Sequence, residues 1–138
     1  MKKLVLVGML SLLVLTGCGK KETVVCTQNK KVSGIEMNVI TNIHLQSSRI
    51  KGIDMEIDVV VPETLKSQKN RLISIVESQY KAYEKSLGAT LKSTETEDGA
   101  KFTVTMTDDQ AKKFSGSKDK VTRKDVIEAF GAQEYECK

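Results

Sequence analysis

The chain has 138 residues, with 22 Lys and Arg, 18 Asp and Glu, and a formal net charge of +4. This length suits one domain with a moderate core. Basic and acidic residues are nearly balanced, so the charge does not favour a nucleic-acid partner. Aromatic residues make up only 4% of the chain and Trp is absent, which argues against a carbohydrate site built on ring stacking.

Residues 1–17 have the pattern of a secretory signal. Lys2 and Lys3 precede an apolar run over 4–15, and small residues follow it. A basic end, an apolar middle and a small-residue cleavage site define a signal peptide. The run is shorter than the roughly 20 apolar residues that span a bilayer. We therefore expect residues 1–17 to be removed; the alternatives are an uncleaved anchor and a plain signal peptide.

The segment Leu15-Thr16-Gly17-Cys18 resembles the lipobox of bacterial lipoproteins. The resemblance implies that Cys18 receives a diacylglyceryl thioether and becomes the first residue of the mature protein. Residues 18–23 would then be a lipidated tether, and 24–138 a single globular domain. The implied location is the outer face of a cell membrane, with the membrane as a partner. In a cell with two membranes, Gly19 in place of Asp favours the outer membrane.

Two further cysteines, Cys26 and Cys137, lie near opposite ends of the exported domain. An even pair in an exported protein favours a disulfide. Such a bond would join the first strand to the C-terminal tail. The alternative is a pair of free thiols.

Alternating apolar residues predict a sheet in the first half of the chain. A first strand is expected over 23–28 and a turn over 29–31, after which Ser33 and Gly34 either break the next strand or mark a bulge. Apolar residues alternate from 35 to 45, and most regularly from 53 to 61. A connection over 47–52 separates these two strands, so an antiparallel hairpin or meander is expected.

One long amphipathic helix is expected over 63–87. Pro62 suits a helix start, where its missing N–H costs nothing, and Gly88 suits a C-terminal cap. The apolar stripe of this helix has helical spacing and would cover one face of the sheet; it consists of Leu65, Leu72, Val76, Tyr80, Tyr83 and Leu87.

The remaining elements are short. Strands are expected over 90–95 and 101–107, because Asp98-Gly99 between them is a strong hairpin signal. Short helices are expected over 108–114 and, after a capping box of Thr122 and Asp125, up to residue 130. The fold class is therefore α+β, with an antiparallel sheet covered by one long helix and by short C-terminal helices.

Several of these features together resemble the YehR-like family of small bacterial lipoproteins of unknown function. They are the lipobox Cys18 followed by Gly19-Lys20-Lys21, early strands, a helix that ends over 80–88, a Thr-rich hairpin, and Asp-Asp-Gln-Ala-Lys-Lys at 108–113. The resemblance implies a surface lipoprotein with no established activity. It supplies no catalytic residues.

The residues that could carry chemistry each have a simpler interpretation. His44 is the only histidine, so a site with several histidines is excluded, and a strand histidine on a sheet face is expected. Asp54, Glu56 and Asp58 could hold calcium, but apolar residues alternate with them as in a solvated strand face. Tyr80 and Tyr83 are expected in the core; they would line a groove if the sheet left one end of the helix uncovered.

We therefore expect no catalytic residue, cofactor or metal. The sequence favours a non-enzymatic binding module for an envelope protein or a small ligand. An inhibitory or accessory subunit of an exported enzyme is the alternative, and a hydrolase is the weakest hypothesis because the required constellations are missing. A free edge strand would favour a protein partner, whereas a deep pocket would favour a ligand.

Overall fold

The computed structural model describes residues 21–116 and 120–138. Cys18 and the expected signal peptide lie outside these residues. The described elements, in chain order, are β1 (Lys21–Val32), β2 (Ile35–Gln46), β3 (Arg49–Val60), η1 (Glu63–Gln68), α1 (Lys69–Leu87), β4 (Thr90–Glu95), β5 (Gly99–Met106), α2 (Asp108–Phe114), α3 (Arg123–Gly131) and β6 (Glu136–Cys137).

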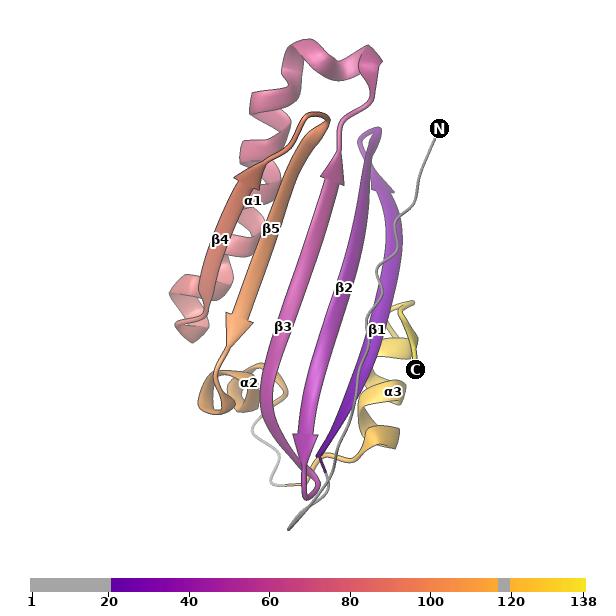
Figure 1. Ribbon diagram of the computed structural model, residues 1–138, viewed down its shortest axis with the longest axis vertical. Helices are drawn as coiled ribbons and strands as arrows, with labels where there is room; N and C mark the ends of the chain where they lie inside the picture. Colours follow the sequence, from indigo (N-terminus) through magenta and orange to yellow (C-terminus); the bar gives the residue numbers. More distant parts are fainter. Residues whose placement is uncertain (1–20, 117–119) are drawn as a thin grey trace.

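The six strands form one antiparallel sheet in the order β4-β5-β3-β2-β1-β6. The described helices all lie on one side of it, behind the sheet in the view of Figure 1. The long helix runs behind β4 and β5, and α3 lies near β1. The structure therefore confirms the predicted α+β fold, with a long helix and two short ones packed on an antiparallel sheet.

The core lies between the sheet and the helices. Strand side chains alternate between the two faces of a sheet, and here one face collects the apolar residues. Those that are at most 2% exposed come from four adjacent strands: Val24, Cys26, Met37, Val39, Ile43, Ile53, Ile57, Val59, Phe102, Val104 and Met106. The opposite, polar face carries none of the described helices (Figure 1).

The first hairpin differs from the sequence prediction. The predicted turn over 29–31 is wrong, because β1 continues to Val32 and pairs with β2 throughout. The chain turns at Ser33 and Gly34, whose φ angles are +53° and +83°. Two positive φ values form the type of two-residue turn that matches the twist of a hairpin. The strand also begins at Lys21, inside the segment expected to be a tether.

The second hairpin turns at Ser47 and Ser48, both with positive φ, and β3 starts at Arg49. The expected connection over 47–52 is therefore mostly strand. The β2–β3 register shifts between His44, opposite Gly52, and Leu45, opposite Ile50, so this end of the hairpin has a bulge.

The helical segment covers 63–87 as predicted, but its first six residues are a 3-10 helix. Leu65 has non-helical backbone angles, and its N–H donates to the Pro62 carbonyl three residues earlier. The α-helix proper begins at Lys69 and ends at Gly88, whose φ of +80° makes it the predicted left-handed cap. Val76 is the buried residue of α1, and the four other stripe residues of α1 are partly buried against the core: Leu72, Tyr80, Tyr83 and Leu87.

Both short helices begin with a capping box, which satisfies backbone N–H groups at the helix start. In α3 the predicted pair is confirmed, since Thr122 and Asp125 bond reciprocally. In α2 the cap is Thr107, together with Gln110, and Asp108 and Asp109 follow in the first turn. In the described part of the chain, no helix is long and apolar enough to cross a membrane.

Candidate functional site

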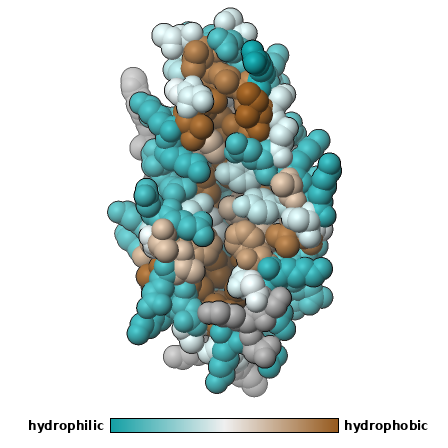
Figure 2. Space-filling view, turned by 180° about the vertical axis from the view of Figure 1, so that it is seen from behind, coloured by the Kyte–Doolittle hydropathy of each residue, from teal (hydrophilic) through white to brown (hydrophobic). Residues whose placement is uncertain are grey.

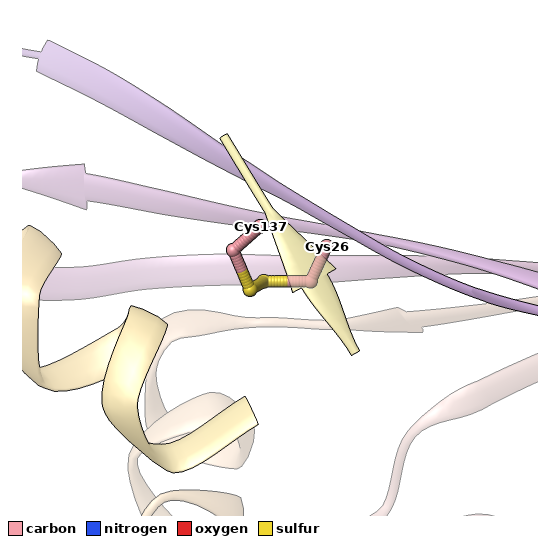
Figure 3. Close-up of a disulfide and its surroundings, with 2 residues drawn as sticks. All are labelled: Cys26 and Cys137. Carbon is pink, nitrogen blue, oxygen red and sulfur yellow. A yellow bond between two sulfur atoms is a disulfide. The ribbon is translucent and has the colours of Figure 1, made fainter. Parts of the chain in front are cut away.

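The predicted bond between Cys26 and Cys137 is present (Figure 3). It joins β1 to β6, a two-residue strand that exists only as a neighbour of β1. Backbone hydrogen bonds between Val25 and Lys138 extend the pairing to the last residue. The bond therefore fixes the C-terminal tail as the sheet edge beside β1.

Tyr80 and Tyr83 pack against the core, as the helical stripe predicts, and both stay partly exposed. Their ring centroids are 6.0 Å apart, and the Tyr83 ring meets Phe114 of α2 edge-on at 5.7 Å. Such contacts stabilise beyond the area that they bury. These tyrosines connect α1 to α2, and the two clefts described below lie elsewhere.

Tyr80, Tyr83 and Tyr135 lie close enough to affect one another, and Tyr135 also lies near Thr41, a buried threonine of β2. Burial first, and then nearby Tyr135 and Tyr83, raise the pKa of Tyr80 to about 12. Burial also raises the pKa of Tyr135, an effect that the neighbouring Thr41 hydroxyl partly offsets. Thr41 is fully buried, and its hydroxyl lies near Tyr135 without meeting the geometry of a hydrogen bond to any described residue. The cluster is thus a polar spot within an otherwise apolar core.

The acidic residues of β3 lie on the polar face of the sheet, and two of the three have a basic partner. Glu56 Oε2 lies 2.9 Å from Nζ of Lys101 on β5, and the hydrogen bond with Glu56 raises the pKa of Lys101. Asp54 contacts His44, and Asp58 is opposite Lys101 in the strand register. Within residues 21–116 and 120–138, no group of three or more His, Cys, Asp or Glu side chains is placed to hold a metal ion.

His44 connects a hydroxyl to a carboxylate on this face. Its Nδ1 is 3.2 Å from Thr23 Oγ1, and its Nε2 is 2.8 Å from Asp54 Oδ2. Gly52 lies directly opposite His44, and a Cβ at this position would be in ordinary van der Waals contact with the imidazole ring. The order of groups matches a catalytic triad, but the His44 and Asp54 side chains are 41% and 50% exposed. Water therefore competes for both groups, unlike in an enclosed active site.

A cleft of about 410 Å³ lies between the first half of α1 and the β4–β5 hairpin. Ile73 of α1 supplies accessible apolar surface above the buried Phe102 of β5, and Glu77 and Glu95 supply carboxylates. A second hollow of about 250 Å³ lies at the tip of this hairpin, beside Pro62. Seen from the helical side, Figure 2 shows apolar surface among hydrophilic side chains on this face of the molecule.

The strand beside this cleft, β4, is the outermost strand of the sheet. Its residues are exposed except Leu91, which is partly buried. An outermost strand presents backbone N–H and C=O groups that no neighbouring strand satisfies. A cleft lined by a helix on one side and a free strand edge on the other can hold an extended peptide.

Sequence reasoning found the disulfide and the tyrosine stripe but missed this cleft and the His44 contacts. Both depend on strand order and register. The order places β4 at the edge although β4 lies in the middle of the chain, and the register brings His44 next to Asp54. The turn at Ser47-Ser48 alone would place Lys51 opposite His44 and Asp54 on the other face of the sheet. Only the bulge between His44 and Leu45 brings Gly52 opposite His44 and Asp54 onto the same face, and the sequence carries no clear signal for that bulge.

Comparison of the chain with protein-family models, with curated proteins and with solved structures found no match.

Proposed function

We propose that this protein is a lipoprotein of the cell envelope, resembling the YehR-like family, whose domain acts as a non-enzymatic binding module. The observation that carries the proposal is the segment Leu15-Thr16-Gly17-Cys18 directly after a basic and apolar leader. Lipid on Cys18 would hold the domain at the extracytoplasmic face of a membrane.

Two features of the folded domain support this location. The Cys26–Cys137 disulfide fits an oxidising, extracytoplasmic compartment. In addition, β1 begins at Lys21, three residues after Cys18. Three residues span at most about 11 Å when extended, so a lipid on Cys18 would keep the sheet close to the membrane surface.

The surfaces of the domain favour binding over catalysis. The His44 contacts are open to water, and the larger cleft combines an apolar floor with a free strand edge. A strand edge favours a protein partner over a small ligand, because it offers a row of backbone groups that another chain can pair with. The same feature suits the alternative of an inhibitory or accessory subunit for an exported enzyme.

The test of the anchor is Cys18→Ser in the full-length chain in its own cell. We expect the wild type to fractionate with membranes and to incorporate labelled fatty acid, and the variant to lose the label and to leave the membrane fraction. The double variant Cys26→Ser/Cys137→Ser is the matched control, because it also removes thiols but keeps Cys18. Membrane retention of unlabelled Cys18→Ser protein would refute the lipoprotein proposal.

A further inference from the structure

We propose that the cleft between α1 and β4 binds a basic, extended segment of a partner protein, which pairs with the free edge of β4 as an additional strand. This inference rests on the proposed binding function and names its partner class. The backbone of the segment would bond to β4, and its Lys or Arg side chains would meet the carboxylates of the cleft.

The hydrogen bonds of the β4–β5 hairpin identify which backbone groups of β4 are free. Thr96 N–H donates to the Gly99 carbonyl at 3.0 Å, which makes these two residues a hydrogen-bonded pair. Bonded and non-bonded pairs alternate along an antiparallel ladder. Thr94 and Lys92 therefore direct their backbone groups toward β5, and Ser93 and Glu95 direct theirs away from the sheet.

The next outward group, at Leu91, is already bonded within the protein. Leu91 N–H also points away from β5, and it donates to the side chain of Glu84 on α1, with Glu84 Oε2 at 3.4 Å. A carboxylate of the protein itself thus occupies the edge at Leu91, at one end of β4. From Ser93 to Glu95, no described side chain bonds the outward groups; beyond them, Lys69 of α1 donates to the Thr96 carbonyl at 3.1 Å. An added segment has room for about three residues here, at the 3.3–3.4 Å rise of a strand.

The cleft continues from this stretch of edge toward α1. Side chains of Ser93 and Glu95 line its β4 side, and Ile73 and Glu77 line its α1 side. A strand added to β4 would point every second side chain into the cleft. Long side chains with apolar stems fit such a surface, because Lys and Arg bury their methylene groups and keep their charged ends accessible.

Charge selects a basic segment. The side chains that line the cleft include the carboxylates of Glu77 and Glu95 and no Lys or Arg. Opposite charge attracts the correct partner, and like charge disfavours others. A second copy of β4 is disfavoured for the same reason, because it would bring another Glu95 to the same acidic site.

The opposite edge of the sheet is protected in a way that β4 is not. There β6 covers Cys26 and Thr27 of β1, and Gln28 bonds the Gln133 carbonyl at 2.8 Å. Beyond this point, two consecutive lysines, Lys30 and Lys31, are exposed on the strand, whereas β4 carries one, Lys92. Lysines on an edge strand oppose pairing with another chain. Among the described strands, β4 is therefore the edge suited to strand addition.

The test uses the full chain in non-ionic detergent micelles and a five-residue probe, Lys-Val-Lys-Val-Lys, with blocked ends. Its matched control is Glu-Val-Glu-Val-Glu. We expect only the basic probe to bind, and binding to slow hydrogen exchange at the Ser93 and Glu95 amides. Binding of neither probe, equal binding of both, or unchanged exchange at these amides would overturn the inference.

Two sets of variants locate the binding site. Ser93→Pro removes an outward N–H, which an edge strand tolerates, and should weaken probe binding about tenfold, the upper range for one hydrogen bond. Ser93→Ala keeps the N–H and removes only the hydroxyl from the cleft, so it should weaken binding clearly less than Ser93→Pro does. Glu77→Gln and Glu95→Gln should each weaken binding about two- to fivefold at low salt, whereas Glu128→Gln on α3 should have no effect. Equal effects of Glu77→Gln and Glu128→Gln would contradict the proposed site, even if Ser93→Pro failed to fold.

The outcome is separable from that of the anchor test. Probe binding needs only the folded domain, whereas membrane retention needs Cys18. If the protein is lipidated but does not bind the basic probe, only the strand-addition site is refuted. A chain that binds the probe but is not lipidated refutes the envelope location alone.

Discussion

Cys26 and Cys137 face each other across β1 and β6 with their Cα atoms 4.0 Å apart, although they are 111 positions apart in the sequence. Their neighbours Val25 and Lys138 exchange both backbone hydrogen bonds. The cysteines therefore occupy the adjacent, non-hydrogen-bonded pair, where side chains of an antiparallel ladder lie closest. The disulfide and this short ladder hold the C-terminal tail against β1.

The first prediction is that Cys26→Ser/Cys137→Ser lowers the free energy of unfolding by up to about 4–5 kcal/mol. In the chain-entropy model, a bond that closes a loop of about 100 residues restricts the unfolded chain by this amount. Urea unfolding with and without reductant measures the loss. Reductant should destabilise the wild type and leave the double variant unchanged, with Cys18→Ser behaving as the wild type. Equal stability of the oxidised and reduced wild type would contradict the prediction.

The second prediction concerns the buried hydroxyl of Thr41. A buried polar group without a hydrogen-bond partner lowers the free energy of unfolding by about 1–3 kcal/mol. Thr41 is fully buried, and its hydroxyl has no such partner among the described residues. Thr41→Val should raise the free energy of unfolding by about 1 kcal/mol. Thr105→Val on the exposed face of β5 is the matched control for the β-propensity of Val and should change stability by less than about 0.5 kcal/mol. A loss of stability in Thr41→Val would show that Thr41 bonds Tyr135 after all.

Local patterns in the sequence predicted most of the elements. The alternation from 53 to 61 defines β3, and Pro62 and Gly88 delimit the helical segment. The capping box of Thr122 and Asp125 marks the start of α3. Each of these signals acts between residues that are close in the chain, so the sequence alone contains the relevant physics.

The errors came from tertiary pairing that overrides local preference. Asn29-Lys30-Lys31 is a polar run typical of a turn, yet β2 continues opposite it, and Asn29 bonds the Asn38 side chain at 2.6 Å. Ser33 and Ser47 adopt positive φ, which serine rarely does, because the strands on either side fix the hairpin. Nothing local could place β4 at the edge of the sheet, since strand order depends on how distant segments pair.

The third prediction concerns Gly99, which starts β5 directly after the hairpin turn. A Cβ at this position would collide with the backbone carbonyl of Val59 and also crowd Val60 Cα. Backbone atoms of a central strand cannot move away as a flexible side chain can. Gly99→Ala should therefore lower the free energy of unfolding by about 2–3 kcal/mol, in the upper range for overpacking.

The control for that substitution is Gly131→Ala, since nothing lies within 4 Å of a Cβ there. Gly131 is the last residue of α3. Alanine should leave stability unchanged or raise it by up to about 1 kcal/mol, because Ala is the better helix former. Thermal or urea unfolding compares the two variants. Similar losses in both would contradict the steric argument at Gly99.

The fourth prediction concerns stability at alkaline pH. Burial, followed by Tyr135 and Tyr83, raises the pKa of Tyr80 from 10.0 to about 12 in the folded protein. Below pH 10, Tyr80 is protonated in both the folded and unfolded states, so its contribution to stability is complete. Between pH 10 and about 12, the unfolded chain loses this proton first, and stability falls as the pH rises. Replacement by Phe removes the ionisation, so the stability of Tyr80→Phe should fall less steeply in this range.

An ultraviolet titration of tyrosinate, taken as the difference between wild type and variant, should give one step with a midpoint near 12. A midpoint near 10 would mean that the Tyr80 hydroxyl is solvated and that α1 packs less closely on the sheet than the structure has it.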